Sequence, residues 1–178
     1  MKMGVALAGM LMLLPLSSSL LPHREPVRLV SSSHTGEAAI VIPLIDPHYP
    51  ANVAADADAL AADVNAERAK HNLPALVRDE TLDRFAYAKA VEMAARGYFG
   101  HTDPNGVTFQ DRLKAWHWPT AYAGENIAFD WDEPHAHAAF MNSPPHAQNV
   151  LDPNEHKIGV AIVTVGRHET FFVENFSQ

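Results

Sequence analysis

The chain has 178 residues, of which 47% are hydrophobic and 19% charged, a composition typical of a folded globular protein and not of a disordered one. It contains no cysteine, which excludes disulfides, zinc–thiolate sites and thiol nucleophiles. The formal net charge is −8 with histidine neutral, and no run of lysine or arginine offsets it, so nucleic acid is not an expected partner.

The first 22 residues have the order of a secretory signal peptide. Lys2 supplies a positive charge, Gly4–Leu14 forms an apolar run, and Pro15 and three serines follow. The run is shorter than the roughly 20 apolar residues that a membrane-spanning helix needs, so no transmembrane anchor is expected. The alternative is an apolar N-terminal helix of the folded domain. We favour export, either to the periplasm or out of the cell.

Residues 23–50 are interpreted as a linker or N-terminal extension that contains several prolines and serines. Proline fixes φ and removes a backbone donor, so the apolar stretch Ala38–Ile45, which Pro43 interrupts, is at most an edge strand. The patterned region begins at residue 51, and 51–178 is expected to form one domain. A domain of about 125 residues buries enough surface to fold without disulfides.

Two helices are predicted at the start of this domain. The first covers 54–70, where Leu60, Val64 and Arg68 recur at helical spacing, and it is expected to end before Pro74. The second begins near Asp79 and ends around Gly97. Its apolar residues form one stripe, as in a helix that packs on a core; they are Leu82, Phe85, Ala86, Ala90 and Met93.

The second half of the domain is predicted to contain shorter elements and a final hairpin. A turn at 101–106 precedes a short helix with Phe109, Leu113 and Trp116 on one side, and 132–141 is a further helix. A turn at 142–145 leads into 146–151. The β-branched run 158–165 and the aromatic run 170–176 are expected to pair as a hairpin. Helices followed by strands favour an α+β or layered domain over repeated βαβ units.

Three short polar turns, far apart in sequence, each place a titratable residue beside aromatic or apolar positions. They contain His101, Glu125 and His146. Two neutral imidazoles and a carboxylate are a suitable ligand set for Zn²⁺ or a similar ion, and three protein ligands leave a position open for water. Composition alone does not select these residues from eleven histidines. His135 and His137, two apart on a predicted helix, are interpreted as a solvated surface.

The order of these segments resembles that of bacterial members of the CAP superfamily, the SCP-like extracellular proteins. The superfamily also includes cysteine-rich secretory proteins, insect venom antigens and plant pathogenesis-related proteins. A single Gly-Glu-Asn tripeptide would be weak support, but about 125 residues carry the motifs in family order. They are Val64-Asn65-x-Glu67-Arg68, Leu73-Pro74-x-Leu76, the segment from Tyr98 to Gly106, Gly124-Glu125-Asn126-Ile127-Ala128, the segment from Phe140 to Leu151, and Ile158-Gly159-Val160.

This resemblance implies a three-layer α-β-α sandwich with a mostly antiparallel sheet and a cleft that contains two histidines and two acidic residues. Carried onto this chain, the family positions are His101, Glu125 and His146, and Asn126 joins the ligand cleft. The second acidic position falls near Ser143, which leaves a His-Glu-His triad. His101 and His146 are the expected metal ligands, for a divalent cation such as Zn²⁺ if one is bound.

Three functions are compatible with these residues. The first is an exported binding module whose cleft takes up a divalent metal, a small or lipid-like molecule, or a component of the cell envelope; family members are linked to sterol, lipid and metal binding. The second is a metal-dependent hydrolase, resembling a peptidase, with Glu125 as the catalytic base. The third is a structural or interaction module. We expect binding rather than catalysis.

Overall fold

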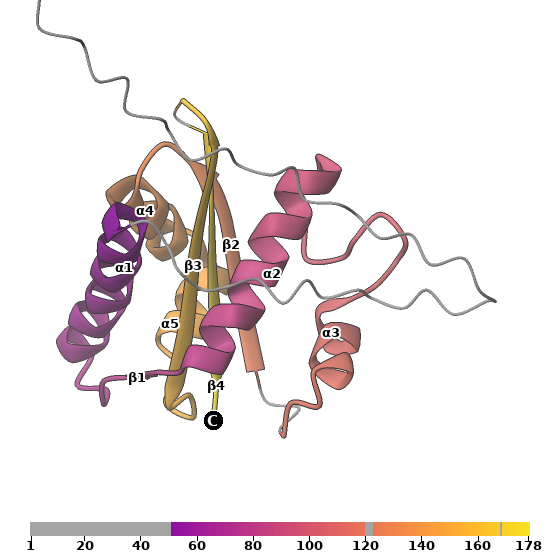
Figure 1. Ribbon diagram of the computed structural model, residues 1–178. Coiled ribbons are helices and arrows are strands. Elements are labelled where there is room, and N and C mark those ends of the chain that lie inside the picture. Colours follow the sequence, from indigo (N-terminus) through magenta and orange to yellow (C-terminus); the bar gives the residue numbers. More distant parts are fainter. Residues whose placement is uncertain (1–50, 120–122, 168) are drawn as a thin grey trace, which may run out of the picture. The chain divides into compact units, whose positions relative to one another are not determined.

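The computed structural model describes residues 51–119, 123–167 and 169–178, with side chains from residue 55 onward. The predicted signal peptide and linker lie outside these residues. Within the described part, five helices and four strands follow one another (Figure 1). In chain order they are α1 (Ala51–Lys70), β1 (Val77–Arg78), α2 (Glu80–Arg96), α3 (Phe109–Ala115), β2 (Ala123–Asp130), α4 (Glu133–Asn142), α5 (Pro144–Val150), β3 (Lys157–Gly166) and β4 (Glu169–Ser177).

The four strands form one sheet in the order β1-β3-β4-β2. The predicted hairpin is confirmed, because β3 and β4 pair antiparallel, and β2 pairs antiparallel with β4 on its other side. The short strand β1 runs parallel to β3, so the sheet is mixed, although most of it is antiparallel. Strand β2 lies at the edge, and its register places Glu125 opposite Asn175 and Asn126 opposite Glu174.

The predicted three-layer arrangement is confirmed. Helices α1, α4 and α5 lie on one side of the sheet, and α2 and α3 lie on the other (Figure 1). The larger apolar cluster fills the layer between the sheet and α1, α4 and α5, with Phe140, Phe172 and Phe176 at its centre. A second cluster packs α2 against the other face through Ala90, Met93 and their neighbours. None of the helices in the described ranges is long and apolar enough to cross a membrane.

Helix α2 has the predicted ends and the predicted buried face. The Asp79 side chain caps its first turn by accepting from the backbone N–H groups of Thr81 and Leu82, and Gly97 is its C-cap. All five apolar residues of the predicted stripe are buried. The helix also packs directly on the backbone of β3, because a Cβ at Gly159 would lie only 2.1 Å from the carbonyl carbon of Leu82.

Helix α1 is tied to α5 by a buried arginine. The Arg68 side chain is fully buried and donates to the carbonyl oxygens of Pro74 and Val150 at 2.8 Å and of Asp152 at 2.9 Å. Its positive charge is therefore spread over main-chain dipoles of two segments, one after α1 and one at the end of α5. This arrangement fixes the position of α5, which carries one of the predicted site histidines.

Two segments differ from the sequence-based expectation. Glu125, which was predicted to lie in a short polar turn, lies instead in the edge strand β2. The turn predicted at 142–145 is shorter, because α5 begins at Pro144, where proline is favourable in the first turn of a helix.

Candidate functional site

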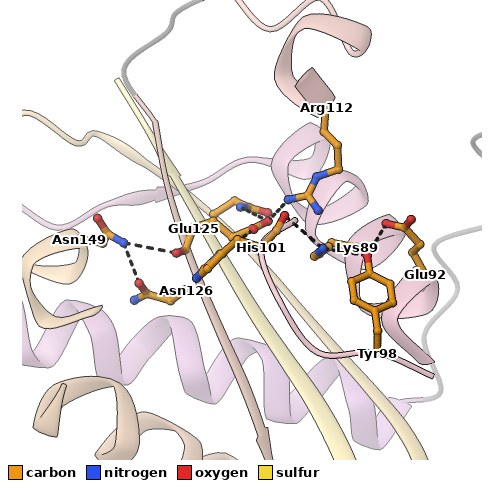
Figure 2. Close-up of polar contacts among 9 residues, drawn as sticks. Lys89, Glu92, Tyr98, His101, Arg112, Glu125, Asn126 and Asn149 are labelled. Carbon is orange, nitrogen blue, oxygen red and sulfur yellow. Dashed lines mark hydrogen bonds and ion pairs between the residues drawn. The ribbon is translucent and has the colours of Figure 1, made fainter. Parts of the chain in front are cut away.

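Glu125 is the centre of the polar network on the α2–α3 face of the sheet (Figure 2). Its side chain is only 2% exposed. One carboxylate oxygen, Oε1, lies 3.0 Å from Nδ1 of His101, and the other, Oε2, accepts from Nη2 of Arg112. Nδ2 of Asn175, the register partner of Glu125 on β4, donates to Oε2 at 3.4 Å. Both oxygens are therefore engaged by neighbouring side chains.

The start of helix α3 at Phe109 sets the position from which Arg112 reaches this carboxylate. Thr108 is the N-cap, and together with Asp111 it forms a capping box that fixes the first turn of the helix. The Arg112 guanidinium then lies over the rings of Phe85 and Phe109, with its central carbon 5.6 and 5.7 Å from their centroids. Arg112 and Glu125 form a buried ion pair embedded among aromatic side chains.

The environment keeps Glu125 ionised. Burial alone would raise the pKa of this carboxyl group, but the hydrogen bond with His101 and the positive charge of Arg112 outweigh burial and hold the pKa below its usual value. A buried carboxylate with a depressed pKa and two occupied oxygens is a poor proton acceptor. Its evident role is to orient His101.

His101 lies in the turn predicted at 101–106, and that turn is held firmly. The Asp103 carboxylate accepts from the backbone N–H groups of Asn105 and Val107 at 2.8 Å and pairs with Arg96 at 2.5 Å. The His101 side chain is 48% exposed. Because its Nδ1 faces an ionised carboxylate, the neutral ring carries its proton on Nδ1 and presents the Nε2 lone pair.

A second polar chain holds the backbone of His101. The Lys89 ammonium group, buried on α2, donates to the Tyr98 hydroxyl at 2.9 Å and to the carbonyl oxygen of His101 at 3.4 Å, and the Tyr98 hydroxyl donates to Glu92 at 2.9 Å (Figure 2). Burial, with the added repulsion of the Arg112 charge, lowers the pKa of Lys89 to about 8. Burial, followed by the bond to Glu92, raises the pKa of Tyr98.

Asn126, next to Glu125 in sequence, faces the opposite side of the sheet. It is fully buried, and its Nδ2 donates to the carbonyl oxygen of His146 at 3.2 Å and to Oε2 of Glu174 at 2.9 Å. Its Oδ1 accepts from Asn149 on α5 at 2.8 Å. With all of these atoms occupied inside the fold, Asn126 holds α5 in position beside β2.

His146 lies on α5, and its ring meets the ring of Phe140 edge to face, with 5.4 Å between centroids. Burial lowers the pKa of His146, and the repulsion between the two imidazoles when both are protonated lowers it further. The two imidazoles therefore lie within electrostatic range of each other. The lowered pKa favours the uncharged form of the His146 ring at neutral pH.

The structure thus joins four of the five predicted site residues in two pairs, His101 with Glu125 and His146 with Asn126. Ser143 is half-buried at the junction of α4 and α5, where its side chain makes no cap hydrogen bond. In the part of the chain that the structure describes, no group of three or more histidine, aspartate or glutamate side chains is arranged to hold a metal ion.

Sequence reasoning missed the charged residues that support this site. Lys89 and Arg112 each sit at helical spacing within an apolar stripe, and Glu174 interrupts an aromatic β-strand. A charge inside a buried stripe needs a partner, so each of these positions indicated a polar network. The sequence did not identify the partners, because they come from other elements.

Comparison with known proteins agrees with this architecture. The chain is 38% identical over 118 residues to the uncharacterized protein YkwD of Bacillus subtilis. The aligned region covers 66% of this chain and 46% of YkwD. An extracellular protein of Bacillus anthracis that contains an SCP domain superposes with a TM-score of 0.63 at 28% identity, over 75% of this chain and 45% of its own. An outer surface protein of Borrelia burgdorferi, 24% identical, shares the fold with a TM-score of 0.64 over 68% of this chain and 91% of its own.

The chain spans less than half the length of the two Bacillus proteins. The family model for CAP, the cysteine-rich secretory protein family, matches residues 61–176, which include His101, Glu125, Asn126 and His146. This chain belongs to the cysteine-rich secretory protein (CAP) family.

Proposed function

We propose that this chain is an exported binding protein that holds a divalent metal ion or a small ligand between the imidazoles of His101 and His146. The observation that carries the proposal is the Glu125–His101 pair. An ionised, buried carboxylate fixes the Nδ1–H tautomer, so that Nε2 of a 48% exposed ring is the free acceptor. A carboxylate that orients a histidine in this way is the usual support of a metal-binding imidazole.

For a metal ion, the donors are the two imidazoles, since both oxygens of Glu125 are already taken. Two protein ligands leave coordination positions for water or for donor groups of a ligand. A site of this kind binds Zn²⁺ more weakly than one with three protein ligands. The lowered pKa of His146 helps, because the metal competes with a proton for imidazole nitrogen.

For an organic ligand, the neighbouring apolar surface matters. Phe99, two residues before His101 in the sequence, is 54% exposed, so the segment that carries the imidazole also presents an apolar side chain to solvent. A molecule with a polar head at His101 and an apolar body against Phe99 would satisfy both features. The similarity to extracellular and outer surface proteins supports a role outside the cytoplasm, in the cell envelope or beyond it.

A hydrolase is the alternative, and one observation gives it a defined form. His101, oriented by Glu125, has the geometry of a base with its orienting residue. In such an enzyme His101 would accept the proton, and Glu125 would act through it. Turnover of a peptide or ester substrate that is abolished in His101→Gln would favour this alternative over simple binding.

Titration calorimetry with Zn²⁺ tests the proposal directly. Protein purified without an affinity tag is compared with His101→Ala, His146→Ala and the double variant. His156→Ala serves as a control because that histidine is exposed and is not one of the predicted site residues. We expect the wild type and the control to bind one ion, and the double variant to lose that binding. Identical titrations of the wild type and the double variant would refute the metal site.

A further inference from the structure

We propose that Glu174 is a positioning residue for His146 that acts in its protonated form, so that loss of its proton weakens binding at the His101–His146 site. The proposal rests on the function proposed above for that site. The Glu174 side chain lies on the face of the sheet opposite to that of Glu125. Glu174 belongs to none of the family motifs. The link between Glu174 and the site is a single amide, Asn126.

Glu174 occupies an unusual place for a carboxyl group. It lies in the central strand β4, between Asn126 of β2 and Val160 of β3, and its side chain enters the apolar layer beneath α1, α4 and α5. It is fully buried. Oε2 accepts from Asn126 at 2.9 Å, whereas Oε1 is buried and has no hydrogen-bond partner among the described residues.

The Asn126 amide transmits the state of Glu174 to the site. Its two N–H groups point to different acceptors, Oε2 of Glu174 and the carbonyl oxygen of His146. Asn149 donates to the Oδ1 of the same amide and to the carbonyl oxygen of Glu125. Any reorientation of the Asn126 side chain therefore changes the contact with the His146 backbone.

The other groups around Glu174 disfavour its charge. The carboxyl group of Glu133 on α4 repels a charge on Glu174. Glu133 in turn is hydrogen-bonded to Asp63 and repelled by Asp56, both of which lie on α1. Neither Val160 of β3 nor the α5 backbone at His146 supplies a positive charge. Burial, with the added repulsion of Glu133 and against the effect of the Asn126 hydrogen bond, raises the pKa of Glu174 to about 8.

Ionisation would therefore leave an uncompensated charge in an apolar layer. A buried charge without a partner is relieved by movement of the side chain or by entry of water. Asn126 donates more strongly to the ionised carboxylate, so its amide follows the displaced Glu174 side chain and leaves the His146 carbonyl. A neutral glutamic acid, or a glutamine, keeps the bond and needs no such relief.

The test is a pH titration of the metal-free protein, followed through the ring resonances of His146 by NMR between pH 5 and 10. We expect two inflections in the wild type, one below pH 6.5 from the ring itself and one near pH 8 from Glu174. Glu174→Gln should abolish the second inflection. Glu155→Gln is the matched control, because Glu155 is also buried with a raised pKa but lies beside Arg68 and Asp152, and it should retain both inflections.

A missing second inflection in the wild type, or its persistence in Glu174→Gln, would overturn the proposal. Zn²⁺ titrations at pH 7 and pH 8.5 give the functional counterpart. Wild-type affinity should fall several-fold more than that of Glu174→Gln over this interval, and Glu174→Leu should bind more weakly at both values. If the NMR result holds and no ligand binds at His101 and His146, the proposed function fails while the positioning role stands.

Discussion

Glu125 and Asn126 are consecutive residues whose side chains leave β2 on opposite faces of the sheet, and each holds one histidine of the proposed site. Glu125 bonds Nδ1 of His101 at 3.0 Å, and Asn126 bonds the carbonyl oxygen of His146 at 3.2 Å. Alternation along an edge strand thus brings a loop from one layer and a helix from the other to the same place. Substitutions on the two faces of the sheet are therefore expected to have different effects on stability and on binding.

The buried ion pair should dominate the stability of the α2–α3 side. Replacing Arg112 by Met removes the ion-pair partner of a buried carboxylate, so the free energy of unfolding should fall by about 3–5 kcal/mol. Urea denaturation measures the change. Arg84→Met is the matched control, since Arg84 pairs with Glu80 on the exposed surface of α2. Equal small effects of the two substitutions would show that the buried pair contributes little.

Glu125→Gln should weaken metal binding without removing either imidazole. The glutamine no longer fixes the Nδ1–H tautomer through an ionised acceptor, and loss of such support typically costs about 10–100-fold in metal affinity. Calorimetry with Zn²⁺ measures the effect at a pH where the variant is folded. Glu169→Gln, an exposed change on β4, should leave the affinity unaltered. Wild-type affinity in Glu125→Gln would mean that His101 needs no orienting partner.

Close packing of β2 against α5 should make Gly124 sensitive to a methyl group. A Cβ at Gly124 would lie 3.0 Å from both Cγ and Oδ1 of Asn149, the residue that bonds Asn126. We expect Gly124→Ala to lower the free energy of unfolding by about 1–3 kcal/mol. Gly100→Ala is the control, because the corresponding distance there is an ordinary 3.6 Å. A neutral Gly124→Ala would contradict the packing described between β2 and α5.

Stability should fall as the pH rises from 6.5 to 8. Burial, together with the repulsion of acidic neighbours, raises the pKa of Glu133 and of Glu155 to about 7 and that of Glu174 to about 8. In the unfolded chain these groups titrate near pH 4.3, so between that value and the folded pKa only the native state holds the protons. The stabilisation is complete below the unfolded pKa and is lost as the pH rises through the folded values.

Two half-buried histidines change the stability in the opposite direction at lower pH. The pKa values of His137 and His146 are lowered by burial, so their contribution is lost as the pH falls below about 6.5. Between pH 6.5 and 8 the carboxyl groups dominate the change in stability, although Lys89, whose pKa burial lowers to about 8, begins to act in the opposite direction at the upper end. Urea unfolding measures the free energy of unfolding at pH 6.5 and at pH 8. The decrease between these two values should be about 1–2 kcal/mol smaller in Glu174→Gln than in the wild type. A wild-type stability that rises over this interval would refute these assignments.

The sequence predicted most of the fold because its local patterns were strong. The apolar stripe of α2, with Asp79 and Gly97 at its ends, and the hairpin of β-branched and aromatic runs are all present. Strand β2 was missed because its sequence, Ala-Gly-Glu-Asn-Ile-Ala-Phe-Asp, alternates poorly: both Glu125 and Asn126 are buried, one on each face. Burial on both faces removes the period-two pattern on which strand prediction depends.

The pairing of His101 with Glu125 followed from family resemblance, and the structure adds the reason for it. The sequence placed three residues in one site, but it did not show which positive charge balances the buried Glu125 carboxylate. Arg112 supplies that balance from a helix thirteen residues earlier, and Lys89 ties the His101 backbone to α2. Such partners are set by the packing of helices on the sheet, which local sequence does not encode.

The most direct test of the account is the tautomer of His101, because the proposed binding group is its Nε2. Long-range ¹H–¹⁵N correlation NMR on the metal-free protein near pH 7.5 distinguishes the two ring nitrogens. We predict a proton on Nδ1 and an unprotonated Nε2, whose resonance alone shifts when Zn²⁺ is added. A proton on Nε2, or no change at His101 on addition of the metal, would contradict the central claim.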